Sequence, residues 1–88
     1  MVQQTVKLNS AMGIIVDSAG ILCKEAMNYR SSISFTCRNT TVNVKSILSV
    51  LAAGVRNGDE MTFVCSGPDE EEALARMVYL AGNGFDTV

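Results

Sequence analysis

The spacing of apolar residues switches repeatedly along this chain between a period of two and a period of three to four, and this alternation constrains the fold. The clearest strand pattern covers 59–66, where Met61, Phe63 and Cys65 alternate with more polar residues after the turn-forming pair Asn57-Gly58. Three other segments carry a strand pattern: 2–8, 32–36 and 41–44. Changes of period this frequent are typical of a mixed fold of short strands and helices.

The residues between the strand segments predict how the first three of these segments are connected. Arg38, Asn39 and Thr40 are turn-prone and separate the second and third strand segments, which predicts an antiparallel hairpin. Between the first two strand segments, apolar residues recur at helical spacing, and Asp17 or Ser18 is expected to cap that helix. The apolar face of this helix is expected to comprise Ala19, Leu22, Cys23, Ala26 and Met27.

Two more helices are predicted in the second half of the chain. A short one begins at Ile47 and ends at Gly54. The last follows Gly67-Pro68-Asp69, and Asp69 and Glu72 have the spacing of a capping box. The acidic run 69–72 suits the positive end of a helix, and its diverging side chains predict no metal site. The buried face of this helix is expected to comprise Ala73, Leu74, Met77, Leu80 and Ala81, before Gly82 and Gly84 end it and 85–88 form a tail.

Length and charge narrow the class of protein. The 88 residues, 48% of them hydrophobic, suit a single domain over 1–88 with one modest core. Only seven basic residues are present and the formal net charge is -2, which argues against nucleic acid or an anionic membrane as a partner. No apolar run approaches the roughly 20 residues of a membrane span, and the polar start is not typical of a signal peptide. We therefore expect a cytoplasmic protein.

The three cysteines indicate neither disulfides nor a metal. Cys23, Cys37 and Cys65 are an odd number and lack metal-ligand spacing, so we expect reduced thiols in the core. Cys37 and Cys65 both fall on inward positions of strands and are expected to be near neighbours across the sheet. No other constellation predicts a cofactor or an enzyme active site.

Ser46 stands where the strand pattern 41–44 gives way to helical spacing, so we expect it to be the N-cap of the short helix. The same end of a helix carries partial positive charge and would hold a phosphate. Two interpretations follow from the residues alone: Ser46 is a simple cap, which is the commoner case, or a regulated phosphorylation site.

Three motifs, by their residues and by their order and spacing along the chain, resemble HPr, the small phosphocarrier family of the sugar phosphotransferase system. The first is Thr41-Val42-Asn43-Val44-Lys45-Ser46-Ile47-Leu48, which matches the family's regulatory-serine segment. The second is Ser66-Gly67-Pro68-Asp69-Glu70, followed by Ala73 and Leu74. The third is Gly13-Ile14-Ile15-Val16-Asp17-Ser18-Ala19, which aligns with the family's phosphohistidine loop, Gly-Ile-His-Ala-Arg-Pro-Ala. The resemblance extends over nearly the whole chain.

The third motif departs from the family where its chemistry resides. Ile15 occupies the position of the phosphoryl-accepting histidine, and Asp17 occupies that of the arginine that offsets the phosphoryl charge. The chain contains no histidine anywhere. Phosphoryl relay needs a nucleophilic nitrogen and positive charge beside the transferred group. We therefore expect no phosphocarrier activity.

The resemblance also implies a fold and a contact surface. The expected fold is an α+β open-faced sandwich, with a four-stranded antiparallel sheet and three helices on one face in the order βαββαβα. In that fold the 13–18 loop lies beside the short helix, so Val16 and its apolar neighbours are expected to form an exposed patch, unless Ile14 and Val16 turn inward. The expected partner-binding residues are Ile14, Ile15, Asp17, Lys45, Ile47, Leu48 and Leu51.

Function is therefore expected to rest on protein contact. In the family, the serine aligned with Ser46 is modified by an ATP-dependent HPr kinase/phosphorylase, and the modified form binds a transcription regulator of carbon catabolite repression. One branch, Crh, lacks the histidine and keeps the serine. Ser49, where the family usually has glycine, is a smaller departure. The alternative is a constitutive interaction or homodimeric scaffold module in which Ser46 is only a cap, and a small-molecule sensor has no pocket signature in the sequence.

Overall fold

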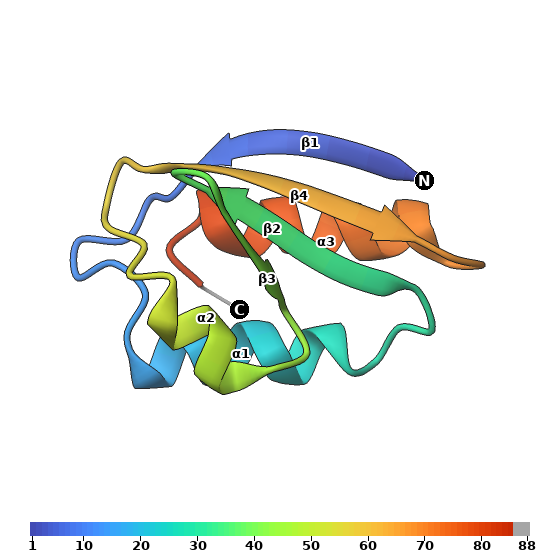
Figure 1. The fold of residues 1–88 in the computed structure, drawn as a ribbon, viewed down its shortest axis with the longest axis horizontal. Helices are drawn as coiled ribbons and strands as arrows, with labels where there is room; N and C mark the ends of the chain where they lie inside the picture. Colours follow the sequence, from blue (N-terminus) through green and yellow to red (C-terminus); the bar gives the residue numbers. More distant parts are fainter. Residues whose placement is uncertain (86–88) are drawn as a thin grey trace.

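A four-stranded sheet carries three helices on one of its faces in the computed structural model, which describes residues 1–85 (Figure 1). The predicted α+β open-faced sandwich with the order βαββαβα is confirmed. The elements are β1 (Val2–Lys7), α1 (Val16–Ala26), β2 (Ser32–Cys37), β3 (Thr40–Asn43), α2 (Ile47–Ala52), β4 (Glu60–Ser66) and α3 (Glu70–Gly82).

All neighbouring strands are antiparallel, in the order β1-β4-β2-β3. Residues that alternate along β4 and β2 are buried against the helices, which explains the clear period of two in these segments. The opposite face of the sheet is polar, and a row of threonines crosses it with side-chain hydrogen bonds of 2.8 Å in the pairs Thr5–Thr62 and Thr36–Thr41. The sheet therefore needs a cover on one face only.

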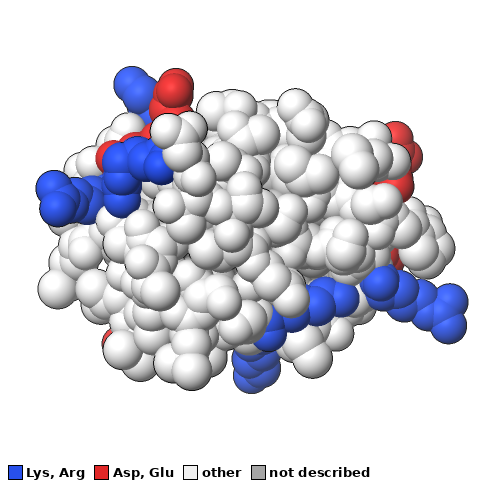
Figure 2. Space-filling view, in the orientation of Figure 1, with Lys and Arg blue, Asp and Glu red and all other residues white. Residues whose placement is uncertain are grey.

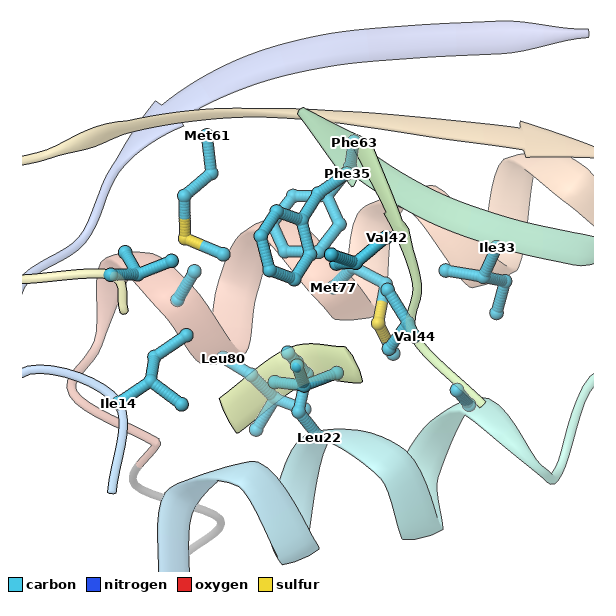
Figure 3. Close-up of a cluster of buried hydrophobic side chains, with 14 of the residues drawn as sticks. Ile14, Leu22, Ile33, Phe35, Val42, Val44, Met61, Phe63, Met77 and Leu80 are labelled. Carbon is cyan, nitrogen blue, oxygen red and sulfur yellow. The ribbon is translucent and has the colours of Figure 1, made fainter. Parts of the chain in front are cut away.

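The core fills the space between the sheet and the helices, as Figure 3 shows. Phe35 and Phe63 face each other from adjacent strands, with ring centroids 5.6 Å apart in an edge-to-face arrangement. Leu22 from α1 and Met77 and Leu80 from α3 approach these rings from the helical layer (Figure 3). The helical spacing of the apolar residues is thus what places one face of α1 and of α3 against the sheet.

The start of α1 differs from the sequence prediction. The helix begins at Val16 with Ile15 as its N-cap, so neither Asp17 nor Ser18 is the cap residue. Ser18 instead acts from the third helical position, where its hydroxyl accepts a hydrogen bond from the Ile15 N–H at 2.9 Å. Met27, predicted on the apolar face, is 64% exposed because α1 ends at Ala26.

The predicted Asp69–Glu72 capping box is wrong. Asp69 is the N-cap of α3, but its carboxylate accepts hydrogen bonds from the backbone N–H groups of Arg30 and Ser31 and from the Ser31 hydroxyl. The Ser31 hydroxyl and these amides lower the pKa of Asp69 to about 2. The carboxylate of Glu70, the first residue of α3, accepts the Gly67 N–H at 3.1 Å and so holds the turn that precedes the helix.

Cys37 and Cys65 are buried as predicted, but they are not neighbours. The register places Cys65 opposite Ile33, four residues along β2 from Cys37, which is an offset of about 13 Å along the strand. Burial raises the pKa of both thiols, which keeps them protonated and unreactive at neutral pH. Cys23 is partly buried, and all three are free.

Phe85, predicted to begin a tail, is buried, and residues 86–88 lie outside the described part of the chain. Within residues 1–85, no helix combines the length and apolar character that crossing a bilayer requires. The described side chains also include no cluster of three or more potential metal ligands.

Candidate functional site

The loop that precedes α1 is held by the segment that follows α2. Gly13 has φ +70, and a Cβ at this position would approach the Val55 carbonyl oxygen to 2.7 Å, so the close contact requires glycine. The next residue, Ile14, donates its N–H to the same carbonyl at 3.0 Å. This bond turns the Ile14 side chain into the core, where it is 8% exposed. The prediction that Ile14 contacts a partner is therefore wrong.

The two residues after Ile14 face outward. Ile15 is 39% exposed and Val16 is 66% exposed, so the alternative in which Val16 turns inward is also wrong. Asp17 is exposed in the first turn of α1. Ile15 and Asp17 border a shallow cavity of about 250 Å³, together with Met12 and Ile21.

Met12 is the residue of this region that sequence reasoning missed. Its side chain is 75% exposed on the rim of the cavity. It lies in the loop between β1 and α1, where no apolar period exists to separate inward from outward positions. The one available signal was its place directly before Gly13, whose backbone conformation turns the chain inward after Met12.

Ser46 occupies the predicted N-cap position of α2, but its hydroxyl does not cap the helix. The Ser49 hydroxyl donates to Ser46 Oγ at 3.1 Å, and no backbone N–H of the first turn reaches this oxygen. The Ser46 carbonyl accepts the first helical hydrogen bond, from the Val50 N–H at 3.1 Å. The side chain is half-buried, so part of it faces solvent.

Lys45, the neighbour of Ser46, holds its ammonium group against the main chain. Its Nζ donates to the Tyr29 carbonyl oxygen at 2.8 Å, in the connection between α1 and β2. Its backbone N–H donates to Asn43 Oδ1 at 3.0 Å. Lys45 therefore connects the segment before α2 with the segment that follows α1.

The outer surface of α2 is apolar. Leu48 is 76% exposed and Ile47 is 38% exposed, whereas Leu51 is partly buried against the core. Ile47 Cδ1 lies 4.0 Å from the place that a Cβ on Gly20 would occupy, so this side chain rests on α1. No residue of α2 is charged, and the surface in this part of Figure 2 is mostly white, with basic side chains at its border. We call the exposed set Ile15, Val16, Ile47 and Leu48 the docking face.

The geometry provides an apolar contact surface with a hydroxyl at its border and no nucleophilic imidazole. Comparison with known proteins identifies its family. A family model described as "PTS HPr component phosphorylation site" matches residues 2–83. The chain belongs to the HPr family. The predicted resemblance to HPr is thereby confirmed, and Crh-like proteins are among its relatives.

Curated relatives include both branches of the family. The HPr-like protein Crh of Bacillus subtilis (strain 168) is 32% identical over 77 residues, which cover 88% of this chain and 91% of that protein. The phosphocarrier protein HPr of Treponema pallidum (strain Nichols) is 33% identical over 86 residues, which cover 98% of each chain.

Solved structures agree with the HPr fold. The crystal structure of HPr-C-His from Thermoanaerobacter tengcongensis matches with a TM-score of 0.91 at 29% identity, over 97% of this chain and 96% of that one. A crystal structure of Crh from Bacillus subtilis, described as a dimer with a swapped domain, matches with a TM-score of 0.77 at 29% identity, over 99% of this chain and 100% of that one.

Proposed function

We propose that this protein is a non-catalytic HPr-like regulatory protein of the phosphoenolpyruvate-dependent sugar phosphotransferase system. It acts in the cytoplasm as one domain over 1–88, through protein contacts, without a cofactor and without enzyme activity. The observation that carries this proposal is the absence of histidine from a chain of a family whose model is named for a phosphorylation site. Ile15 aligns with the phosphohistidine of the family and is exposed on the docking face.

The chemistry at this position argues for contact and against phosphoryl transfer. A relay needs a lone pair on the accepting side chain, which Ile15 does not have, and positive charge near the transferred group. The exposed Asp17 carboxylate would repel the phosphoryl oxygens. An exposed branched apolar side chain among other apolar residues is instead suited to burial against a partner protein.

We further propose that phosphorylation of Ser46 switches the docking face. A phosphate would add about -1.5 to -2 charge at pH 7 and offer strong acceptors to an arginine of the partner. Ser46 directly precedes Ile47 and Leu48, so this charge would stand at the border of the apolar surface. The partners that the family resemblance supplies are an HPr kinase/phosphorylase and a transcription regulator of carbon catabolite repression.

The test is incubation of the purified protein with HPr kinase/phosphorylase and ATP, followed by intact mass measurement. Wild type is expected to gain one phosphate and Ser46→Ala none. Ser49→Ala is the matched control, because it removes the neighbouring hydroxyl that donates to Ser46 Oγ and keeps the proposed acceptor. Failure of the wild type to gain mass would refute the Ser46 switch and leave contact by the docking face without regulation.

A second candidate function is a constitutive homodimeric module that uses the same face. The exposed apolar side chains of the docking face favour this use of the face. Dimer formation itself is seen in crystal structures of two relatives, Crh from Bacillus subtilis, with a swapped domain, and HPr from Thermoanaerobacter tengcongensis. Sedimentation should then show a dimer that Ile15→Lys dissociates. Met27→Lys is the control, since Met27 is an exposed apolar residue outside the face. A monomeric wild type would exclude this candidate.

A further inference from the structure

Arg38 adopts a backbone conformation that arginine rarely takes. It is the first of two turn residues between β2 and β3, with φ +48, and Asn39 follows with φ +66. Hairpin turns of this kind favour asparagine and glycine, because a side chain with φ above zero crowds its own backbone. An unfavourable residue in such a turn persists when its surroundings hold it in place. The contacts of the Arg38 side chain show what holds it.

The Arg38 guanidinium joins α2 to the segment that follows it. Its Nη2 donates to the carbonyl oxygens of Ala53 and Gly54 at 3.2 and 2.9 Å, and its Nη1 donates to the Asp59 carboxylate. The last carbonyls of a helix have no partner within the helix, so this side chain supplies donors at the end of α2. Asp59 also accepts the Arg56 N–H at 2.8 Å, which closes the 56–59 turn around the same carboxylate. We call Arg38 and Asp59 the clamp.

The segment held by the clamp also holds the loop before α1. Within it, the Val55 carbonyl accepts the Ile14 N–H at 3.0 Å. The Asn57 side chain accepts the Ser10 N–H at 3.1 Å. The clamp therefore connects the end of α2 with the loop that directs Ile15 outward.

We propose that Arg38 is a positioning residue for the docking face. Together with Asp59, it fixes the end of α2 against the 54–59 segment, which carries the Ile14 loop. This sets the placement of Ile47 and Leu48 relative to Ile15 and Val16. The use of this placement by a partner rests on the proposed function, whereas the placement itself is a property of the folded chain.

The decisive variant is Arg38→Asn. Asparagine tolerates the positive φ of the turn, so the hairpin is preserved while all three guanidinium contacts are lost. Arg38→Lys retains the charge but lacks the planar fork that reaches a carboxylate and two carbonyls together. Asp69→Asn is the control, because it removes charge from a hydrogen-bond network near the start of α3, at the other end of β4 (Figure 1).

The readout is the nuclear Overhauser effect between the Ile47 δ-methyl group and the Gly20 α-protons, which reports the packing of α2 against α1. We expect Arg38→Asn to reduce this signal to less than about half of its wild-type intensity, and Asp69→Asn to leave it above that level. Local release of the Ile14 amide should accompany the loss, with hydrogen exchange faster by about tenfold relative to the core amide of Phe63. A signal retained in Arg38→Asn, or lost equally in Asp69→Asn, would overturn the proposal.

A parallel kinase assay separates this proposal from the proposed function. If the kinase recognises the position of α2, Arg38→Asn should raise KM for Ser46 phosphorylation and thereby lower kcat/KM. Arg38→Lys should give a smaller loss. An unmodified wild type would end the proposed Ser46 switch, while the Ile47–Gly20 signal would still decide whether Arg38 positions α2.

Discussion

The region around Asp69 and the docking face use their polar groups in opposite ways. Near the start of α3, Ser31 is fully buried and both oxygens of the Asp69 carboxylate accept hydrogen bonds from the 30–31 segment. At the docking face, Ser46 makes a side-chain bond only to another hydroxyl, and Leu48 is 76% exposed. Internal bonds at the first region stabilise the fold, whereas the second region leaves apolar side chains exposed. The part of the chain that stabilises the fold is therefore separate from the part that we propose for partner contact.

Gly67→Ala should show the largest effect and would test how tightly the Asp69 region is packed. Gly67 has φ +152, and a Cβ there would lie 2.6 Å from the Ser31 Cα atom. The main chain at Gly67 or at Ser31 must therefore move to accommodate an alanine. We expect a loss of about 3 kcal/mol in the free energy of unfolding, from overpacking and backbone strain together. Urea denaturation monitored by circular dichroism measures it.

Gly58→Ala is the matched control for this prediction. Gly58 also has positive φ, at +88, but a Cβ there would meet no atom within 4 Å. Only the cost of holding a non-glycine residue at positive φ remains, so the free energy of unfolding should fall by about 1 kcal/mol. Equal losses in the two variants would show that the close contact with Ser31 adds nothing, and the contrast between the two regions would lose its strongest support.

The next prediction concerns pH. The pKa of Asp69 is about 2 in the folded protein, below the value of roughly 3.9 expected in the unfolded chain. The depressed pKa means that the ionised carboxylate stabilises the fold above about pH 4, and this contribution is lost as pH falls from about 4 to about 2. Unfolding free energies measured by urea across this range should fall less steeply for Asp69→Asn than for wild type.

Subtracting the two profiles isolates this carboxylate. The pKa values of Asp59 and Glu70 are also lowered, mainly by the backbone N–H groups of Arg56 and Gly67, so both titrate in each protein and their effects cancel in the difference. Parallel profiles for wild type and Asp69→Asn would contradict the assignment of this pH dependence to Asp69.

Features that follow from repeated burial could be predicted from the sequence, whereas features that depend on single contacts between distant residues could not. The order of elements and the burial of Phe63 or Leu22 follow from apolar periods, because burial against a sheet repeats along a strand or helix. The inward turn of Ile14 depends on one hydrogen bond to Val55, and the separation of Cys37 from Cys65 depends on register. Neither feature can be predicted from the spacing of neighbouring residues in the sequence. Pairings between distant residues, such as Asp69 with Ser31, fall in the same class.

Serine at the N-cap position was predictable, but its hydrogen bond was not, and this gives the smallest expected effect. Because the Ser46 hydroxyl accepts only from the Ser49 hydroxyl, Ser46→Ala removes this side-chain bond but no bond to a backbone N–H of the first turn of α2. The usual loss of about 1 kcal/mol for a deleted cap should therefore be absent, and the unfolding free energy should change by no more than about 0.5 kcal/mol. The measurement is urea denaturation at pH 7 beside wild type. A loss near the full capping value would mean that the hydroxyl caps α2 in solution, and that Ser46 belongs with the stabilising groups rather than with the docking face.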